Sequence, residues 1–325
     1  MDNDAIADLL GRQDGVICRR QVLACGGAHY DIRRLLRRRA WATVHPGVYV
    51  DHTGDLTWRQ RAWAAVLHAG PDAALDRESA IRADAGPGWR GSREGDPIRV
   101  AVDATRTVTD TPGVRVRRIA GLAAKVRWSA SPPRVLIEEA TLDYALSRGD
   151  DHAAFEALAA SVRARCTTAQ RLLDTVVARP RIGRRRWLVD VLTDIRDGSC
   201  SVLEHGYLTR VERAHGLPTS RRQHHEAPAG AHGLYRDVHY EGLGVEVELD
   251  GRAFHDEPDQ KDDDLDRDLD LVVQQRVSVR LGWGQVYRRT CRTASRVARI
   301  LQARGWEGSP ARCGPTCELD GSAAA

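Results

Sequence analysis

The spacing of apolar residues predicts three short helices near the start of the chain. Apolar positions recur every three or four residues within 4–13, 19–25 and 28–39. Alternating apolar residues on either side of a Pro-Gly turn then predict a β-hairpin over 41–50. Three short helices followed by a hairpin are typical of a winged-helix domain, which we place at residues 1–52.

Beyond this domain the pattern predicts a central module, at residues 53–197, in which mixed elements are followed by helices. Its first part is expected to contain helices over 57–69 and 77–83 and strands over 98–102 and 114–118. Its second part is expected to contain helices over 134–147, 150–164, 168–177 and 183–195. A C-terminal α/β domain is expected at 198–305, and a flexible tail at 306–325. The fold class is therefore α+β and multidomain.

Composition agrees with several folded domains and limits the possible chemistry. The 325 residues are 42% hydrophobic and 29% charged, and the formal net charge of +4 does not by itself indicate nucleic acid. No run of about 18 apolar residues occurs, and no signal peptide leads the acidic N-terminus, so we expect a cytoplasmic protein with no membrane contact. Only Lys125 and Lys261 are lysines among 49 basic residues, which leaves two candidates for a catalytic lysine.

Seven cysteines are scattered along the chain and do not form a disulfide framework. Cys313 and Cys317 are the one close pair. A zinc site there would need two more ligands, and Cys291 is a candidate for one of them. The spacing favours reduced cysteines in an ordinary tail over a metal site.

Arginines cluster on the third predicted helix, away from its apolar side. In a winged helix this element enters the major groove of DNA, where arginine pairs with guanine or contacts phosphate. We therefore expect double-stranded DNA as a partner. The predicted DNA-binding residues are Tyr30, Arg33, Arg34, Arg37, Arg38 and His45 of the hairpin turn. A solvated face in an arginine-rich protein is the alternative.

Residues 245–250 alternate between aliphatic and acidic side chains without a fault. On a strand this alternation places Glu246, Glu248 and Asp250 on one face. The face could be a wet outer surface, on which the acids are spread in water. A second strand that brings further acids alongside would instead favour a metal site.

The preceding segment, 234–240, supplies such a strand. If residues 241–244 form a four-residue hairpin loop, Tyr240 pairs with Val245 and Asp237 lies opposite Glu248. Like charges directly opposite one another on a sheet are destabilising, so this pair favours a bound cation. Oxygen ligands suit Mg²⁺ or Mn²⁺ better than zinc.

A third element can bring one more acid to this site. Ser201 and Glu204 begin a predicted helix with the spacing of a capping box, which is a sufficient structural explanation for both. The functional interpretation instead places Glu204 beside the metal. Downstream, a helix that carries Arg267 and a strand that carries Arg280 complete the order helix, strand, strand, helix, strand.

The N-terminal region resembles a known family. Residues 15–22, 32–41 and 44–49, together with the segment Ala74-Leu75-Asp76-Arg77-Glu78-Ser79-Ala80, look like the winged helix and following module of AbiEi-family type IV antitoxins. The resemblance covers about residues 1–180. It implies DNA binding, often self-repression of an operon, and a possible toxin partner, but it carries no catalysis.

The C-terminal region resembles PD-(D/E)XK nucleases of the subgroup related to very short patch repair endonucleases. The matching residues are Ser201 to Glu204, Asp237, Val247 to Gly251, His255, Arg267 and Arg280. By that resemblance Asp237 and Glu248 bind the metal, which activates a water and stabilises charge on the scissile phosphate. Glu204 orients the metal or a water, and Arg280 or Arg267 neutralises the phosphate charge.

One position departs from the nuclease pattern. The usual lysine two residues after the second acid is absent, and Asp250 stands there. The subgroup commonly lacks this lysine, but its absence leaves the general base open. His255 is the best candidate because imidazole titrates near neutrality, although a lone histidine after a turn is as often structural.

Two functional hypotheses therefore stand. The first is a metal-dependent DNA endonuclease that its winged helix directs to DNA. The second is a non-catalytic regulator or antitoxin that represses its own operon and uses the nuclease-like domain as a scaffold or as a toxin-binding surface. A third option, a nucleotidyltransferase toxin, lacks the Gly-Ser and paired-Asp motif that such enzymes carry.

Overall fold

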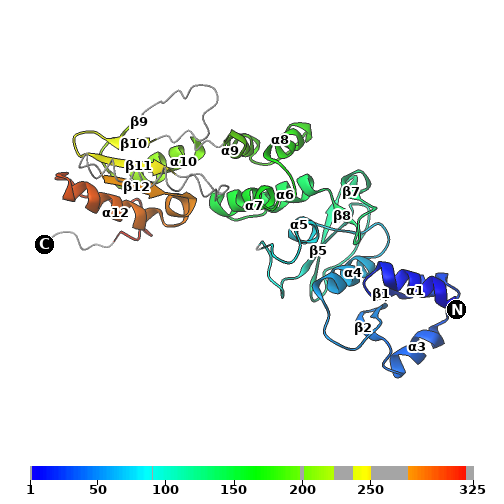
Figure 1. The fold of residues 1–325 in the computed structure, drawn as a ribbon. Helices are drawn as coiled ribbons and strands as arrows, with labels where there is room; N and C mark the ends of the chain where they lie inside the picture. Colours follow the sequence, from blue (N-terminus) through cyan, green and yellow to red (C-terminus); the bar gives the residue numbers. More distant parts are fainter. Residues whose placement is uncertain (1, 90, 198–200, 223–236, 250–276, 320–325) are drawn as a thin grey trace, which may run out of the picture. The chain divides into compact units, whose positions relative to one another are not determined.

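The protein is α+β, and in its described residues helices accompany three separate β-sheets (Figure 1). The computed structural model describes residues 2–89, 91–197, 201–222, 237–249 and 277–319. Contacts divide the chain into unit 1, residues 1–147 and 160–167, and unit 2, residues 148–159 and 168–325. The predicted division after residues 52, 197 and 305 stays a prediction. In the described part of the chain, no helix is both long and apolar enough to cross a membrane.

Unit 1 begins with three short helices and a three-stranded sheet. The helices are α1 (Asn3–Arg12), α2 (Arg19–Ala24) and α3 (His29–Arg37), and the strands are β1 (Val16–Cys18), β2 (Ala42–His45) and β3 (Val48–Val50). These helices and the β2–β3 hairpin lie where the apolar spacing predicts them. Strand β1 was not predicted, because three consecutive buried residues show no alternation. In the sheet β3 lies between β1 and β2 and is antiparallel to both.

Two apolar clusters hold this region together and tie it to the next helix. The first cluster lies between the helices and the sheet, and its buried members are Ile6, Ile17, Val22, Ile32, Trp41 and Tyr49. In the second cluster, Trp63 of α4 (Trp58–Ala69) packs against Val16, Val48 and Val50. The helices are thus oriented by burial of their apolar sides, which leaves their polar sides outward.

A five-stranded sheet forms the rest of unit 1, in the order β6-β5-β4-β8-β7. Its strands are β4 (Ala74–Leu75), β5 (Ile98–Asp103), β6 (Val114–Ile119), β7 (Val126–Arg127) and β8 (Arg134–Val135). Helices α4, α5 (Arg77–Ala85) and α6 (Ile137–Leu146) accompany it. The helix expected over 134–147 therefore starts three residues late, because Arg134 and Val135 pair with β7 and Arg134 pairs with β4.

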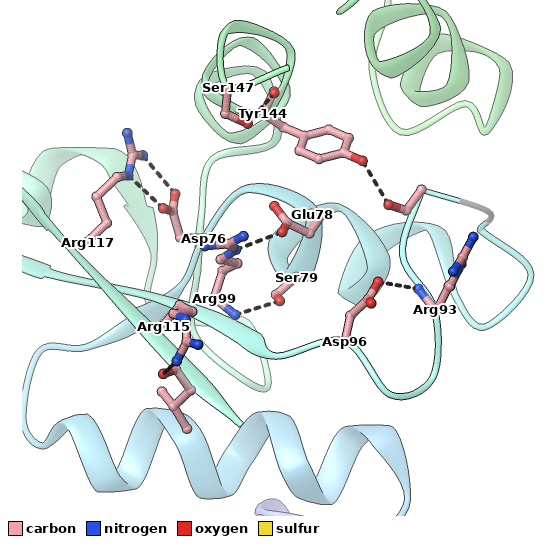
Figure 2. Close-up of polar contacts among 12 residues, drawn as sticks. Asp76, Glu78, Ser79, Arg93, Asp96, Arg99, Arg115, Arg117, Tyr144 and Ser147 are labelled. Atoms are coloured by element: carbon pink, nitrogen blue, oxygen red, sulfur yellow. Dashed lines mark hydrogen bonds and ion pairs between the residues drawn. The ribbon is translucent and has the colours of Figure 1, made fainter. Parts of the chain in front are cut away.

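The segment around Asp76 ties α5 to this sheet, as Figure 2 shows. Asp76 lies immediately before α5 and receives two N–H groups from Arg117 of β6, at 2.7 and 2.9 Å. Ser79 Oγ accepts the backbone N–H of Arg99 on β5, and Glu78 binds the side chain of Arg99. These polar residues therefore have structural partners within unit 1.

Unit 2 starts with helices and ends with a four-stranded sheet and a long helix. The helices are α7 (Asp151–Arg163), whose last turn belongs to unit 1, α8 (Ala169–Ala178), α9 (Arg185–Asp197) and α10 (Ser201–Gly206). The helix expected after Ser201 continues as a π-helical segment, η2 (Tyr207–Glu212), and a 3₁₀ turn, η3 (Arg213–His215), where Gly216 ends it with a positive φ of 63°.

The sheet of unit 2 has the order β12-β11-β10-β9. Its strands are β9 (Arg221–Arg222), β10 (Asp237–Tyr240), β11 (Val245–Leu249) and β12 (Val277–Leu281). The pair β11–β12 is parallel, and the other pairs are antiparallel. A π-helical turn, η4 (Gly284–Arg288), and helix α12 (Thr290–Ala303) follow β12, and the helix expected near Arg267 lies outside the described residues.

Candidate functional site

Three neighbouring strands bring Asp237, Glu248 and Arg280 into one row. Asp237 of β10 is the antiparallel partner of Glu248 on β11, and Glu248 is the parallel partner of Arg280 on β12. The hairpin loop has positive φ at Gly242 and Gly244, which lets four residues reverse the chain. The predicted register of β10 and β11 is therefore confirmed, pair by pair.

Glu248 is held in this row by two hydrogen bonds from β12. Its Oε1 accepts the Ser278 hydroxyl at 3.0 Å, and its Oε2 accepts Nε–H of Arg280 at 3.1 Å. The Glu248 side chain is 5% exposed, whereas that of Arg280 is 38% exposed. A charge-assisted bond of this kind fixes the orientation of the carboxylate better than a bond between neutral groups does.

The second acid of β11 is also buried. Glu246 lies opposite His239, and one of its oxygens is 3.3 Å from His239 Nε2. All five residues of β11 are buried, on both faces of the strand. The wet outer face that the alternation allowed is therefore wrong for Glu246 and Glu248, and burial of two carboxylates requires partners for both.

A buried network of hydroxyl and carboxyl groups connects η2 to the same sheet. The hydroxyls of Tyr207 (η2) and Tyr240 (β10) are 2.8 Å apart, and Tyr240 also donates to Glu212 at 3.4 Å. Burial raises the pKa of the Glu212 carboxyl, against the lowering effect of its hydrogen bond from Ser220. Sequence analysis missed this network, since Tyr207 and Tyr240 sit at positions that ordinary core residues also fill.

The remaining predicted catalytic residues are placed only in part. Glu204 is buried in α10. Asp250, His255 and Arg267 lie outside the described residues. The row of Asp237, Glu248 and Arg280 is thus the part of the predicted set that the sheet brings together by backbone register.

The arginines of α3 form an exposed basic surface in unit 1. Arg33, Arg34, Arg37 and Arg38 are all exposed, and so is Tyr30, at 63%. Arg34 pairs with Asp31 at 3.2 Å, and Asp31 also caps the start of the helix by accepting the N–H of Ala28. Ile32 on the opposite side is buried in the apolar cluster, so burial of one side presents the arginines to solvent.

His45, the last residue of the predicted DNA-binding set, has a different environment. It is half-buried, and its ring lies 4.8 Å from the ring of His68 in α4. Burial lowers its pKa, and the neighbouring His68 lowers it further. His45 therefore favours the neutral form and packs against α4, whereas the arginines of α3 face solvent.

In the described part of unit 2, one group of side chains lies close enough together to hold a metal ion. His215, Cys291, Cys313 and Cys317 supply one nitrogen and three sulfurs, which do not suit Mg²⁺ or Mn²⁺.

Comparisons with known proteins give no family assignment. No family model matches the chain, and no curated protein matches it. Among solved structures, a crystal structure of the RV2827C protein from Mycobacterium tuberculosis aligns with a TM-score of 0.37 and 16% sequence identity. The alignment covers 58% of this chain and 76% of that one.

Proposed function

We propose that this chain is a DNA-binding protein with a metal-dependent endonuclease domain that hydrolyses phosphodiester bonds. The observation that carries the proposal is the row of Asp237, Glu248 and Arg280 across three adjacent strands. Two acids that face each other beside an arginine provide ligands for a cation and a positive charge for a phosphate in one place.

The donor chemistry fits Mg²⁺ or Mn²⁺ as the ion. Asp237 and Glu248 would hold it, and when bound it supplies an activated water and neutralises charge on the scissile phosphate. Arg280 orients Glu248 through its Nε–H and adds positive charge beside the phosphate. In this proposal the sheet and its flanking helices form a restriction-endonuclease-like domain.

Four further residues complete the proposed catalytic set. Glu204 orients the metal or a water from α10, and His255 acts as the general base. Asp250 stands two residues after Glu248, where PD-(D/E)XK nucleases outside this subgroup usually carry lysine, and Arg267 assists Arg280 at the phosphate. These roles rest on the resemblance to the nuclease subgroup.

Unit 1 supplies DNA binding in this proposal. Its order of three helices and a hairpin, with β1 as a third strand, supports a winged helix in which α3 is the reading element. Exposed arginines on α3 give it the charge that contact with phosphates or guanines needs. We take double-stranded DNA as the partner and Tyr30, Arg33, Arg34, Arg37 and Arg38 as the contact residues, with His45 at the wing.

A plasmid-nicking assay tests the nuclease. The wild-type protein should relax supercoiled DNA when Mg²⁺ or Mn²⁺ is added, and Asp237→Asn or Glu248→Gln should slow this by at least about 100-fold. Glu241→Gln is the matched control, because Glu241 is an exposed acid of the same hairpin that pairs with Arg221. Equal rates in wild type and Glu248→Gln, or no nicking by either, would exclude the nuclease.

A second candidate is a non-catalytic regulator or antitoxin that represses its own operon. One observation favours it: both oxygens of Glu248 already accept hydrogen bonds, from Ser278 and Arg280, so this acid is satisfied by protein groups. A cognate toxin is a partner only under this candidate.

A gel-shift titration with the DNA upstream of the gene tests α3 under either candidate. Arg34→Ala with Arg37→Ala should weaken binding about tenfold or more and reduce the slope of log affinity against log salt by about 2. Arg118→Ala, an exposed arginine of β6, is the control and should change neither quantity. If the protein binds this DNA specifically but does not nick it, the regulator is the remaining candidate. If the double variant binds as tightly as the wild type, α3 is not the element that reads the DNA.

A further inference from the structure

Four side chains from three separate segments of unit 2 converge on one point. His215 ends η3, Cys291 lies in the first turn of α12, and Cys313 and Cys317 follow α12. One nitrogen or sulfur atom from each residue lies within 4.8 Å of all the others. The Sγ atoms of Cys291 and Cys313 are 3.7 Å apart. Two thiolates on one tetrahedral zinc, each at about 2.3 Å from the metal, are separated by about 3.8 Å.

His215 is oriented as a metal ligand. Its Nδ1 lies 3.0 Å from the backbone oxygen of Val211, which only accepts, so Nδ1 carries the proton and Nε2 carries the lone pair. The side chain is fully buried, and within the described part of the chain Nε2 has no hydrogen-bond partner. A buried, unsatisfied nitrogen is costly, and a bound metal would satisfy it. Ligating histidines characteristically donate their other N–H to a backbone carbonyl in this way.

The backbone around the two C-terminal cysteines is held in place by the same part of the fold. The N–H of Ala311 donates to the backbone oxygen of His215 at 2.7 Å. Between the cysteines, the N–H of Cys317 donates to Gly314, and the Arg312 guanidinium donates to the backbone oxygen of Cys317. Cys317 and Leu319 are buried, so this part of the predicted flexible tail packs against the domain.

We propose that His215, Cys291, Cys313 and Cys317 bind one Zn²⁺ ion in a closed, structural site. Three thiolates and one imidazole are the donor set of structural zinc, and four protein ligands leave no open position for catalysis. Three Zn–S bonds and one Zn–N bond form as the three thiols release their protons to solvent. The ion would hold the segment 311–317 against η3 and α12. None of its ligands belongs to the row of Asp237, Glu248 and Arg280. The zinc proposal and the nuclease proposal can therefore be tested independently.

Metal analysis of the full-length, untagged protein tests the site. After exchange into buffer without added metal, the wild type should retain about one zinc per chain, since structural sites release zinc slowly and bind it tightly. Cys313→Ser should retain less than about a tenth of that amount; Cys313 is exposed, so the substitution leaves the core intact. Cys166→Ser, in unit 1, is the matched control and should keep its zinc.

Cobalt gives a readout that does not depend on how the protein was expressed. Co²⁺ added to the zinc-free protein should produce the intense visible bands of tetrahedral cobalt and a thiolate-to-cobalt charge-transfer band. Both should be absent in Cys313→Ser, and His215→Gln should shift them if the variant folds. Zinc removal should lower the Tm of the wild type by about 5 °C or more and leave that of Cys313→Ser unchanged.

Two results would overturn the proposal. One is a wild type that lacks zinc and gives no cobalt bands. The other is a disulfide: if Cys291 and Cys313 are bonded to each other, alkylation of the unfolded, unreduced protein labels five cysteines instead of all seven. If the wild type binds zinc but does not nick DNA, the nuclease proposal fails and the zinc proposal stands.

Discussion

The two larger sheets of this protein bring acids and an arginine together in different ways. In unit 1, Arg117 donates to both oxygens of Asp76 and reaches Asp143 at 2.5 Å. One arginine therefore bridges two acids. In unit 2, Arg280 donates to Glu248 at 3.1 Å, but it lies on β12, and β11 separates it from Asp237 on β10.

The difference indicates when the charges of an acidic cluster are balanced by protein groups alone, without a bound ion. Burial opposes the charge on Arg117, yet its hydrogen bonds to Asp76 and Asp143 and their charges raise its pKa above the ordinary value. That cluster is closed by its own bridging cation. In unit 2 the backbone register places Asp237 opposite Glu248 on one side and Arg280 opposite Glu248 on the other. The proposed function places a metal ion between Asp237 and Glu248.

A third arrangement, in unit 1, pairs two histidines. His45 and His68 lie ring against ring, and burial followed by the charge of His68 lowers the pKa of His45. Here burial, more than the charge of His68, favours the neutral form of His45. Each of the three clusters brings like groups together. A bridging arginine stabilises the first, a metal ion is proposed for the second, and a neutral histidine is favoured in the third.

The largest expected effect belongs to the closed cluster. Asp76→Ala should lower the free energy of unfolding of unit 1 by about 3 kcal/mol, because it leaves the partly buried Arg117 without its bidentate partner. Urea denaturation measures this. Asp8→Ala is the control, since Asp8 forms an exposed pair with Arg12 in α1 and its loss should cost about 0.5 kcal/mol. Equal losses in the two variants would show that Asp76 does not stabilise unit 1 through a buried ion pair.

Substitutions in the row of Asp237, Glu248 and Arg280 should lower the free energy of unfolding less than Asp76→Ala does. Glu248→Gln should cost about 1 kcal/mol or less, because removal of one of two facing acids offsets the lost bond from Arg280, which can then be hydrated. Arg280→Ala should cost more, about 2 kcal/mol, because it leaves buried Glu248 opposite Asp237.

Magnesium sharpens this difference. If the row binds the ion, Mg²⁺ should raise the Tm of the wild type and leave that of Glu248→Gln unchanged, since a ligand stabilises only the state that binds it. A Tm of the wild type that does not respond to Mg²⁺ or Mn²⁺ would place this row with the Asp76 cluster, as a purely structural arrangement.

The row of acids could be predicted because its information is local. A period of two along 245–250 and a four-residue loop determine which residue of β10 faces Glu248, and both are visible in the sequence. The N-terminal helices were predictable for the same reason, from apolar residues one turn apart. Short strands such as β1 and β8 contain too few residues to show a period.

The other features depend on contacts between distant segments. His215 meets Cys291, Cys313 and Cys317 only because η3, α12 and the following segment pack together, and no spacing in the sequence relates a residue at 215 to one at 313. Similarly, Asp76 finds its partner 41 positions away, on β6. Burial of Glu246 could not be predicted from the alternating pattern either. The pattern separates the two faces of a strand, but it does not show whether other elements cover the polar face.

The smallest expected effect concerns the histidine pair. The folded pKa of His45 lies below its ordinary value of about 6.5, so at acid pH the unfolded chain binds a proton that the folded chain resists. The Tm of unit 1 should therefore be constant above about pH 7 and fall by a few degrees as the pH drops below about 6.5. Thermal melts of His45→Gln should show a shallower fall, while His29→Gln, at an exposed position at the start of α3, should behave as the wild type. A steeper fall in His45→Gln would reverse the sign and show that the folded state favours the charged imidazole.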